Sequence, residues 1–195
     1  KVGSLVDLTC FSFNPVKNLG AMGDAGAVTG KKELIDKVRM YRNHGRRTQF
    51  EYDVVGYNSR IDNLQAVVIE SKLKKLNEWT EKKRKICHRY TAELKGIVKC
   101  PEEAPWSYHT YYVYVIETPE GTRNALQEHL KAKGIQTNIH YRSPTHTTKA
   151  FEQYGVRLPR TEYVCDNILS LPCYFTLPKH HQDYIIKAIK EFYNS

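Results

Sequence analysis

Apolar residues in the first 60 positions follow two strand patterns and then one helical stripe. The uncharged, β-branched and aromatic run LTCFSF predicts a buried strand over residues 8–13. A second short strand is expected over residues 26–29. Residues 32–42 predict an amphipathic helix whose apolar face is formed by Leu34, Ile35, Val38 and Tyr41. Residues 43–57 follow neither period, which is typical of a long loop.

The most sustained periodicity runs from Asp62 to about Leu94. Apolar residues recur there at three- and four-residue spacing, and no proline or glycine interrupts them. We therefore expect one continuous helix, which at about 1.5 Å per residue would reach a length of nearly ~50 Å. A helix of that length suits a bridge between two domains, and Gly96 is expected to mark its end.

The rest of the chain alternates between strand and helix patterns, which predicts a small α+β unit. Strands are expected over residues 108–117, 135–141 and 168–172, and helices over residues 122–133, 150–154 and 179–193. Three tyrosines at strand spacing are expected to be core or edge residues, namely Tyr111, Tyr112 and Tyr114. The pattern divides the chain into two domains, residues 1–95 and residues 96–195.

Composition limits the cellular setting. The chain has 195 residues, of which 41% are hydrophobic, so it can bury a substantial core. No apolar run approaches the ~20 residues that a membrane-spanning helix needs. The five cysteines are widely spaced and form no CxxC motif, which indicates free thiols in a reducing compartment and no metal site. We expect a cytoplasmic protein that does not enter a membrane.

The formal net charge of +9 fits either a basic solvated surface or an anionic partner, which would be nucleic acid or a phosphorylated small molecule. Much of this charge lies on the long predicted helix, where the lysines are typical of a solvated face. Nucleic-acid binding would require basic residues interleaved with exposed aromatic residues, and the sequence has no such motif. The charge therefore only makes an anionic substrate unsurprising, and nucleic acid is not expected.

Lys17 is the strongest candidate for a reactive group. It lies in the turn between the first two expected strands, in the sequence NPVKNLG. Apolar packing around its ammonium group would favour the neutral amine, which can attack a carbonyl and form a Schiff base. Ser12 precedes Lys17 by five residues and offers a hydroxyl group for an anion.

The segment FSF-x-P-x-KNLG-x-x-GD-x-GAV, residues 11–28, resembles the Schiff-base region of the DegT/DnrJ/EryC1/StrS family. These proteins are sugar aminotransferases with the fold of aspartate aminotransferase. Further segments resemble family motifs in the same order, namely RNHG at 42–45, GYNSRIDNLQA at 56–66, YxxPxH at 141–146 and LSLP at 169–172. The resemblance extends over essentially the whole chain. It implies an α/β fold made of the end of a large cofactor-binding domain, residues 1–95, and a small C-terminal α+β domain, residues 96–195.

The resemblance also implies a cofactor, pyridoxal 5′-phosphate, and a role for several residues. Lys17 would hold the cofactor as a Schiff base and then move a proton during amino transfer. Ser12 would donate a hydrogen bond to the cofactor phosphate. Asn58 would reach the phosphate bound by the neighbouring subunit of a homodimer with shared active sites. Candidates for the substrate side are Arg60, Tyr141 and His146.

Each of these roles has a structural alternative. Asn58 and Arg60 precede the long helix and could form only a helix-start network, since Asn favours such boundaries. His146 could equally be a loop histidine with satisfied hydrogen bonds. Arg46 and Arg47 lie in the 43–57 loop, and their guanidinium groups suit a substrate diphosphate. That last assignment follows from their position in the loop.

The implied function is transfer of an amino group from L-glutamate to a nucleotide-linked keto-sugar, in the biosynthesis of polysaccharides or antibiotic sugars. A sugar dehydratase of the same family is an alternative. The family members that dehydrate the sugar have a histidine at the lysine position, so Lys17 favours amino transfer. In the family, the acidic partner of the pyridine nitrogen, the stacking aromatic residue and a phosphate-binding loop come before the lysine. They would precede Lys1, so a truncated non-catalytic subunit is a further alternative.

Overall fold

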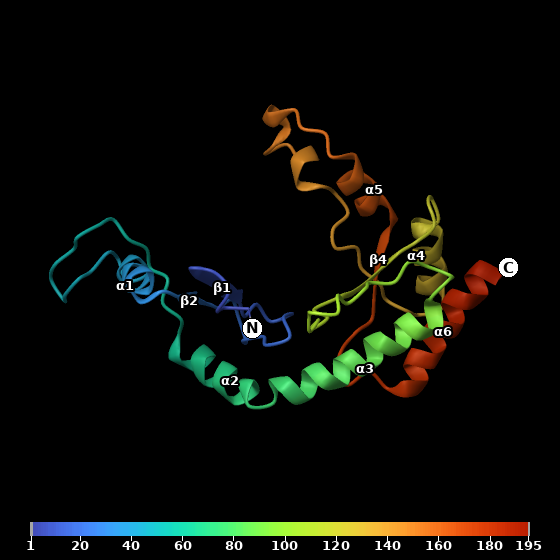
Figure 1. Ribbon diagram of the computed structural model, residues 1–195, viewed down its shortest axis with the longest axis horizontal. Coiled ribbons are helices and arrows are strands. Elements are labelled where there is room, and N and C mark those ends of the chain that lie inside the picture. The colour runs from blue at the N-terminus through green and yellow to red at the C-terminus, as the bar shows by residue number, and fades with distance from the viewer. Residues whose placement is uncertain (1, 195) are drawn as a thin grey trace. The chain divides into compact units, whose positions relative to one another are not determined.

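The computed structural model describes residues 2–194, which fold as two compact units that divide between Asn77 and Glu78 (Figure 1). Helices and strands occur in both units, as expected for a mixed α/β chain. Lys1 and Ser195, the outer ends of the two expected domains, lie outside the described residues.

The first unit is built on a two-stranded antiparallel hairpin. Strands β1 (Leu8–Ser12) and β2 (Gly26–Gly30) pair along their whole length, with Leu8 opposite Gly30 and Ser12 opposite Gly26. Both expected strands are confirmed. The expectation that the first of them is buried was wrong, because its residues alternate between exposed and half-buried. A hairpin of two strands buries little of either face, and no third strand pairs with it among the described residues.

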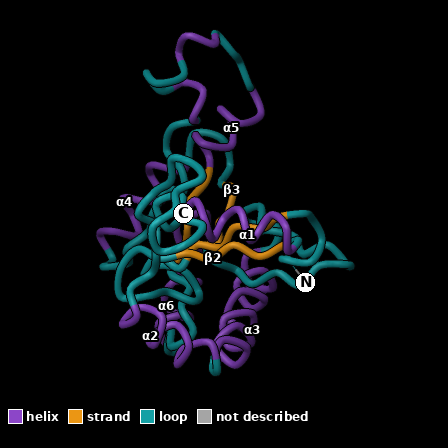
Figure 2. Tube along the Cα trace, turned by 90° about the vertical axis from the view of Figure 1, so that its left-hand side faces the viewer, coloured by secondary structure: helices purple, strands orange, loops and turns teal. Residues whose placement is uncertain are grey.

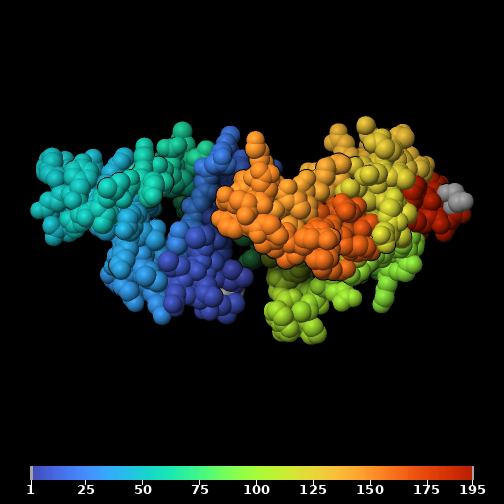
Figure 3. Space-filling view, turned by 90° about the horizontal axis from the view of Figure 1, so that it is seen from above, coloured from blue at the N-terminus to red at the C-terminus, as the bar shows by residue number. Residues whose placement is uncertain are grey.

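Two helices accompany the hairpin in the first unit. Helix α1 (Lys32–Tyr41) confirms the amphipathic helix; Leu34, Ile35 and Val38 of its apolar face are half-buried, whereas Tyr41 is exposed. Helix α2 (Asn63–Leu73) follows after the expected loop, residues 43–57. This loop gathers at one end of the unit, where the cyan atoms lie in Figure 3. Isolated bridges pair Asn43 with Asn58 and Arg46 with Tyr52, so the loop has its own internal order.

The long helix expected from Asp62 to Leu94 is interrupted. Helix α2 ends at Leu73, and helix α3 (Leu76–Leu94) begins three residues later. At the break the amide of Lys75 donates to the carbonyl of Lys72 at 2.9 Å, a tighter turn than the α-helical one. Continuous periodicity predicted no break, but α2 and most of α3 belong to different units, so tertiary packing outweighs the local pattern. The units accordingly divide ahead of the expected boundary near residue 95.

The core of the second unit surrounds a short antiparallel pair, β3 (Tyr114–Glu117) and β4 (Ile168–Leu171). Helices α3, α4 (Arg123–Ala132) and α6 (Lys179–Asn194) pack their apolar faces into the same cluster. The large side chains that are fully buried are Tyr90, Leu94, Tyr114, Ile116, Leu126, Leu130, Leu169 and Ile189. Helices α4 and α6 and strand β4 confirm the expected elements.

Two expected strands of the second unit are shorter than their patterns suggested. The strand expected over residues 108–117 is limited to β3, because buried Tyr111 has a positive φ of 45° that interrupts the extended backbone. The prediction of a strand over residues 135–141 is wrong. That segment makes one bridge, between Asn138 and Ser170, with amide–carbonyl distances of 2.7 and 3.2 Å.

The segment between β3 and β4 also differs from the pattern. Short 3-10 turns occur at Thr145–Thr147 (η1) and at Glu152–Tyr154 (η2), in place of the helix expected over residues 150–154. Helix α5 (Pro159–Asn167) was not predicted, although proline at its first position is a recognised start signal. Residues 141–158 extend away from the rest of the second unit as loops and short turns (Figure 2).

None of the helices within residues 2–194 is long and apolar enough to cross a bilayer. In the same part of the chain, histidine, cysteine, aspartate and glutamate side chains form no cluster of three that could hold a metal ion.

Glu103 anchors the segment after α3 and has a strongly lowered pKa. The Arg84 guanidinium contacts its carboxylate at 2.7 and 3.1 Å, and the amide of His109 donates to it at 2.6 Å. These hydrogen bonds lower the pKa of Glu103 from 4.5 to about 2. Because the folded state favours the ionised form, the stability from this carboxylate is fully present above pH 4.5 and is lost as the pH falls towards 2.

We therefore expect wild type to lose more unfolding free energy than Glu103→Gln between neutral pH and about pH 2. Urea unfolding followed by circular dichroism measures this difference. An equal loss in the two proteins would contradict the assigned role of the carboxylate.

Candidate functional site

The turn that carries Lys17 is closed by backbone hydrogen bonds just beyond the hairpin. The amide of Phe13 donates to the carbonyl of Ala25 at 2.7 Å, and the amide of Ala21 donates back to the carbonyl of Phe13 at 2.8 Å. Inside this closed turn, the amide of Lys17 donates to the carbonyl of Asn14 at 2.9 Å. The side chain of Lys17 is half-buried. The turn therefore fixes the backbone from which Lys17 projects.

Asn14 links the two sides of the same turn through its side chain. Its Nδ2 donates to Asp24 Oδ1 at 2.7 Å, and its Oδ1 accepts from the amide of Val16 at 3.2 Å. Its own amide donates to Ser12 Oγ at 3.3 Å. Since a hydroxyl can accept and donate at once, Ser12 retains its proton for an anionic acceptor. Ser12 is exposed, so such an acceptor can reach it.

Helix α2 holds the Lys17 turn from one side through two residues. The Oε1 of Gln65 accepts from the amide of Met22 at 2.8 Å, and Lys72 Nζ donates to the carbonyl of Gly20 at 2.6 Å. Lys72 was expected on a solvated face but is half-buried against the turn, so that expectation was wrong. The sequence feature that could have indicated this contact is the spacing of Gln65 and Lys72. Seven residues are about two helical turns, so both side chains lie on one face of the helix.

Gly20 allows the turn to close tightly, and replacing it tests the turn. A Cβ at this position would lie 2.3 Å from the carbonyl oxygen of Pro15. We expect Gly20→Ala to destabilise the turn by about 1–3 kcal/mol, as overpacking does in a tight site. Amide exchange at Ala21, whose hydrogen bond closes the turn, should become faster. The control is Met22→Ala in the same turn, where the side chain is exposed, and unchanged exchange in Gly20→Ala would contradict the prediction.

Asn58 and Arg60 lie together at a second polar surface of the first unit. The bridge between Asn43 and Asn58, and the bond from the Ser59 amide to the Arg42 carbonyl at 2.9 Å, hold this segment beside the end of α1. A pocket of about 840 Å³ is lined there by Arg42, Asn58, Arg60, Ile61, Asp62, Asn63, Leu64 and Gln65. Among the described residues that line it, neither Lys17 nor Ser12 occurs. The structure thus brings Asn58 and Arg60 together at a pocket whose Gln65 also contacts the Lys17 turn through the amide of Met22.

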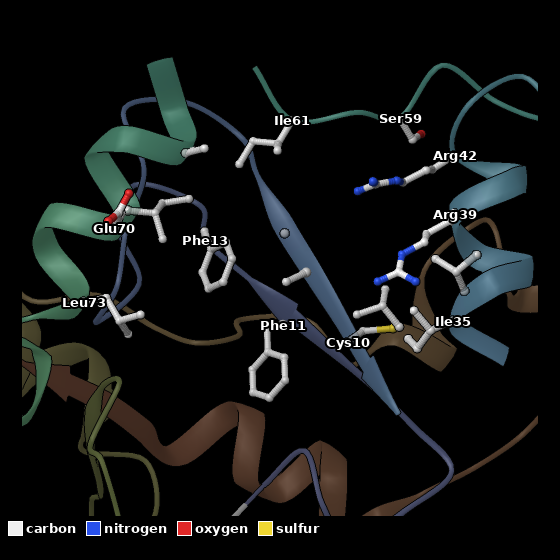
Figure 4. A pocket seen from close by; sticks show the side chains of 16 residues that line it. Cys10, Phe11, Phe13, Ile35, Arg39, Arg42, Ser59, Ile61, Glu70 and Leu73 are labelled. Atoms are coloured by element: carbon white, nitrogen blue, oxygen red, sulfur yellow. The ribbon is translucent and has the colours of Figure 1, made fainter. Parts of the chain in front are cut away.

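A second, apolar pocket lies between the hairpin and helices α1 and α2 (Figure 4). It has a volume of about 770 Å³. Its lining includes Phe11 of β1, Phe13 just after β1, and Ile35 of α1. Two cationic side chains, Arg39 and Arg42, reach towards it from the α1 side in Figure 4. This pocket explains why the apolar side chains of the hairpin and of α1 are only half-buried.

The two loop arginines have partners within their own loop. Arg46 Nε donates to the hydroxyl of Tyr52 at 3.1 Å. Arg47 forms ion pairs with Glu51 at 3.3 Å and with Asp53 at 3.1 Å. A diphosphate that binds Arg47 would have to replace these two carboxylates. The sequence pattern did not indicate these ion pairs.

The remaining candidates lie in the second unit. Tyr141 is exposed and follows a cis peptide bond after His140. His146 Nε2 lies 3.0 Å from Glu162 Oε1 at the start of α5. The hydrogen bonds from His146 and from the amide of Leu158 lower the pKa of Glu162. His146 therefore has a satisfied partner, which agrees with the structural alternative considered for it.

The sequence and the fold can be compared with known proteins. The model of the DegT/DnrJ/EryC1/StrS aminotransferase family matches residues 1–190. A "pleiotropic regulatory protein" from Geobacillus stearothermophilus is 38% identical over 98% of this chain and 53% of its own length. A UDP-N-acetyl-3-dehydro-α-D-glucosamine 3-aminotransferase from Acidithiobacillus ferrooxidans is 39% identical over 89% of this chain and 47% of its own length.

The fold has a close counterpart among solved structures. A crystal structure of NtdA from Bacillus subtilis, with the cofactor PMP bound, superposes with a TM-score of 0.90 and 28% identity. The match covers 97% of this chain and 46% of that one. The chain thus spans about half the length of the curated relatives and of the solved structure that it matches.

Proposed function

Because the chain belongs to the DegT/DnrJ/EryC1/StrS aminotransferase family, we propose that it is part of a pyridoxal-phosphate-dependent enzyme. This enzyme transfers an amino group from L-glutamate to a nucleotide-linked keto-sugar. The observation that carries the proposal is the closed turn that carries Lys17 and begins directly after Ser12. A relative that is 39% identical is named as an aminotransferase of a UDP-linked keto-sugar, which supports the substrate class.

The residues of the Lys17 turn fit the cofactor in their chemistry. An aldehyde requires an amine, which Lys17 supplies, and a phosphate requires hydrogen-bond donors, of which Ser12 is one. The Ser12 oxygen already accepts from the Asn14 amide at 3.3 Å, and its proton can still be donated to another acceptor. A solved relative with bound PMP supports the same cofactor class.

When bound, the cofactor supplies an electron sink for the carbon that gains or loses the amino group. Lys17 Nζ would hold the cofactor covalently and would move a proton at the reacting carbon of the substrate. Ser12 Oγ would donate to the phosphate. Gln65 and Lys72 keep the turn in place, so that the amine returns to the same position in each cycle.

Asn58 extends the proposal to a homodimer. Its side-chain amide is exposed beside Arg60, and we assign it to the cofactor phosphate of a neighbouring subunit. A second subunit then completes each site. Arg60, Tyr141 and His146 are assigned to the substrate side, and Arg46 and Arg47 to its diphosphate. In this proposal residues 1–95 end the large cofactor domain, residues 96–195 form the small domain, and the protein acts in the cytoplasm.

The proposal is tested by incubating the full-length protein with pyridoxal 5′-phosphate, L-glutamate and nucleotide-linked 3-keto-sugars. We expect a cofactor absorbance band, and an amino-sugar product whose formation depends on glutamate. A dehydrated product that forms without glutamate would favour the dehydratase alternative. Absence of both the band and any product would contradict the enzyme assignment.

A non-catalytic role is the second candidate function. It is favoured by one observation, the 38% identity to a relative named as a regulatory protein. In that case the full-length protein would bind the cofactor with unchanged absorbance in the presence of glutamate. Bleaching of the band by glutamate would exclude this candidate.

A further inference from the structure

Two cysteines of the second unit lie in direct contact. Cys87 on helix α3 and Cys173, just after strand β4, are 86 positions apart in the sequence. Their sulfur atoms are 3.0 Å apart, and closure to a disulfide of about 2.05 Å requires an approach of about 1 Å. Both are free thiols in the structure. The fold has therefore already brought distant segments into bonding range.

A buried lysine lies beside the pair. Lys83 precedes Cys87 by one helical turn, and its Nζ donates to the carbonyl of Tyr112 at 2.8 Å. The hydrogen bond from Cys87 and the charge of Lys83 lower the pKa of Cys173, although burial opposes them. The same hydrogen bond and burial raise the pKa of Cys87. These opposite directions favour the Cys173 sulfur as the nucleophile of the pair, in agreement with its partial exposure.

The two cysteines differ in their access to the surface. Cys173 lines a surface pocket of about 340 Å³ together with Tyr112, His140 and Ser170. Cys87 is completely buried. A small oxidant can therefore reach Cys173 through this pocket, while Cys87 is reached only by Cys173.

We propose that Cys87 and Cys173 form a redox-modification site that a hydroperoxide closes to a disulfide. The Cys173 thiolate attacks a peroxide oxygen, so that a sulfur–oxygen bond forms as the oxygen–oxygen bond breaks. The hydroxide released takes up a proton and leaves as water. The Cys87 sulfur then displaces the oxygen from Cys173, and this oxygen leaves as a second water with the Cys87 proton. Two electrons pass from the sulfur pair to the peroxide.

The site is tested by treating the purified native protein with hydrogen peroxide, removing the peroxide with catalase and alkylating the remaining thiols after denaturation. We expect the loss of two alkylatable thiols and of the mass of two hydrogen atoms, both reversed by dithiothreitol. After digestion with trypsin, the Cys87 peptide, residues 86–89, should be linked to residues 161–179. This readout requires neither cofactor nor activity, so it is independent of the proposed function.

Variants identify the sulfur atoms, because residues 161–179 also contain Cys165. Cys173→Ser and Cys87→Ser should abolish the link, whereas the matched control Cys165→Ser should retain it. Lys83→Met should slow closure, since the charge beside Cys173 is removed. Far-ultraviolet circular dichroism of each reduced variant checks its fold. Oxidation of Cys173 to a sulfinic acid without a link, a link to another cysteine, or no loss of thiols in wild type would each overturn the proposal.

Discussion

Lys17→Ala is expected to reduce amino transfer by about 100- to 10,000-fold, the range typical of a lost proton-transfer group. The alanine side chain can neither hold the cofactor nor move a proton at the reacting carbon. The closed turn should persist, because backbone hydrogen bonds and the Asn14 side chain close it. Turnover of glutamate with a nucleotide-linked keto-sugar, measured on the full-length protein, gives the loss directly.

Two further variants sharpen this test. Lys17→Arg keeps the positive charge but cannot become neutral at physiological pH, so it should be as impaired as alanine. Lys37→Ala, at an exposed position of helix α1, is the matched control and should be close to wild type. Activity of Lys17→Ala within a factor of about three of wild type would remove Lys17 from the mechanism, since such a change is only about 0.6 kcal/mol.

Leu169→Ala is expected to destabilise the second unit by about 2–5 kcal/mol, the range for truncating a buried leucine. Leu169 lies in β4 opposite Ile116 of β3, and its side chain is fully buried. Its removal leaves a cavity at the centre of the cluster formed by β3, β4 and the helices around them. Urea unfolding followed by circular dichroism measures the loss.

Leu158→Ala provides the matched control for the core substitution. Leu158 precedes helix α5 and is 44% exposed, so its truncation should change the free energy of unfolding by no more than about 0.5 kcal/mol. A similar loss in the two variants would mean that β4 is not the centre of the core.

The sequence predicted best those elements whose hydrogen bonds are local. The hairpin over β1 and β2 and helices α1, α4 and α6 depend on residues close in sequence, and their patterns were sufficient. The interruption near Lys75 was missed because apolar spacing continues across it, while the packing of two separate units decides where the helix ends. The strand expected over residues 135–141 failed for a related reason, since its pattern could not supply the missing strand partner.

The candidate site divides in the same way. Ser12 ends β1 and Lys17 lies in the turn that follows, so both positions could be predicted from the sequence alone. The contact of Lys72 with Gly20 joins residues 52 positions apart, and the lysine itself has the appearance of a surface residue. The ion pairs of Arg47 with Glu51 and Asp53 could not be predicted from the sequence either, because pairing within a loop depends on how its backbone folds.

Helix α2 makes two contacts with the Lys17 turn, through Gln65 and Lys72. The segment between these residues should therefore tolerate substitutions better than changes in its length. Inserting one residue between Gln65 and Lys72 would rotate one contact by roughly 100° around the helix axis, which removes it from the turn. Substitutions at the exposed positions between them, such as Val67 and Ser71, leave both contacts in place. Among natural variants of this protein, α2 should therefore accept many changes of side chain but no insertion or deletion.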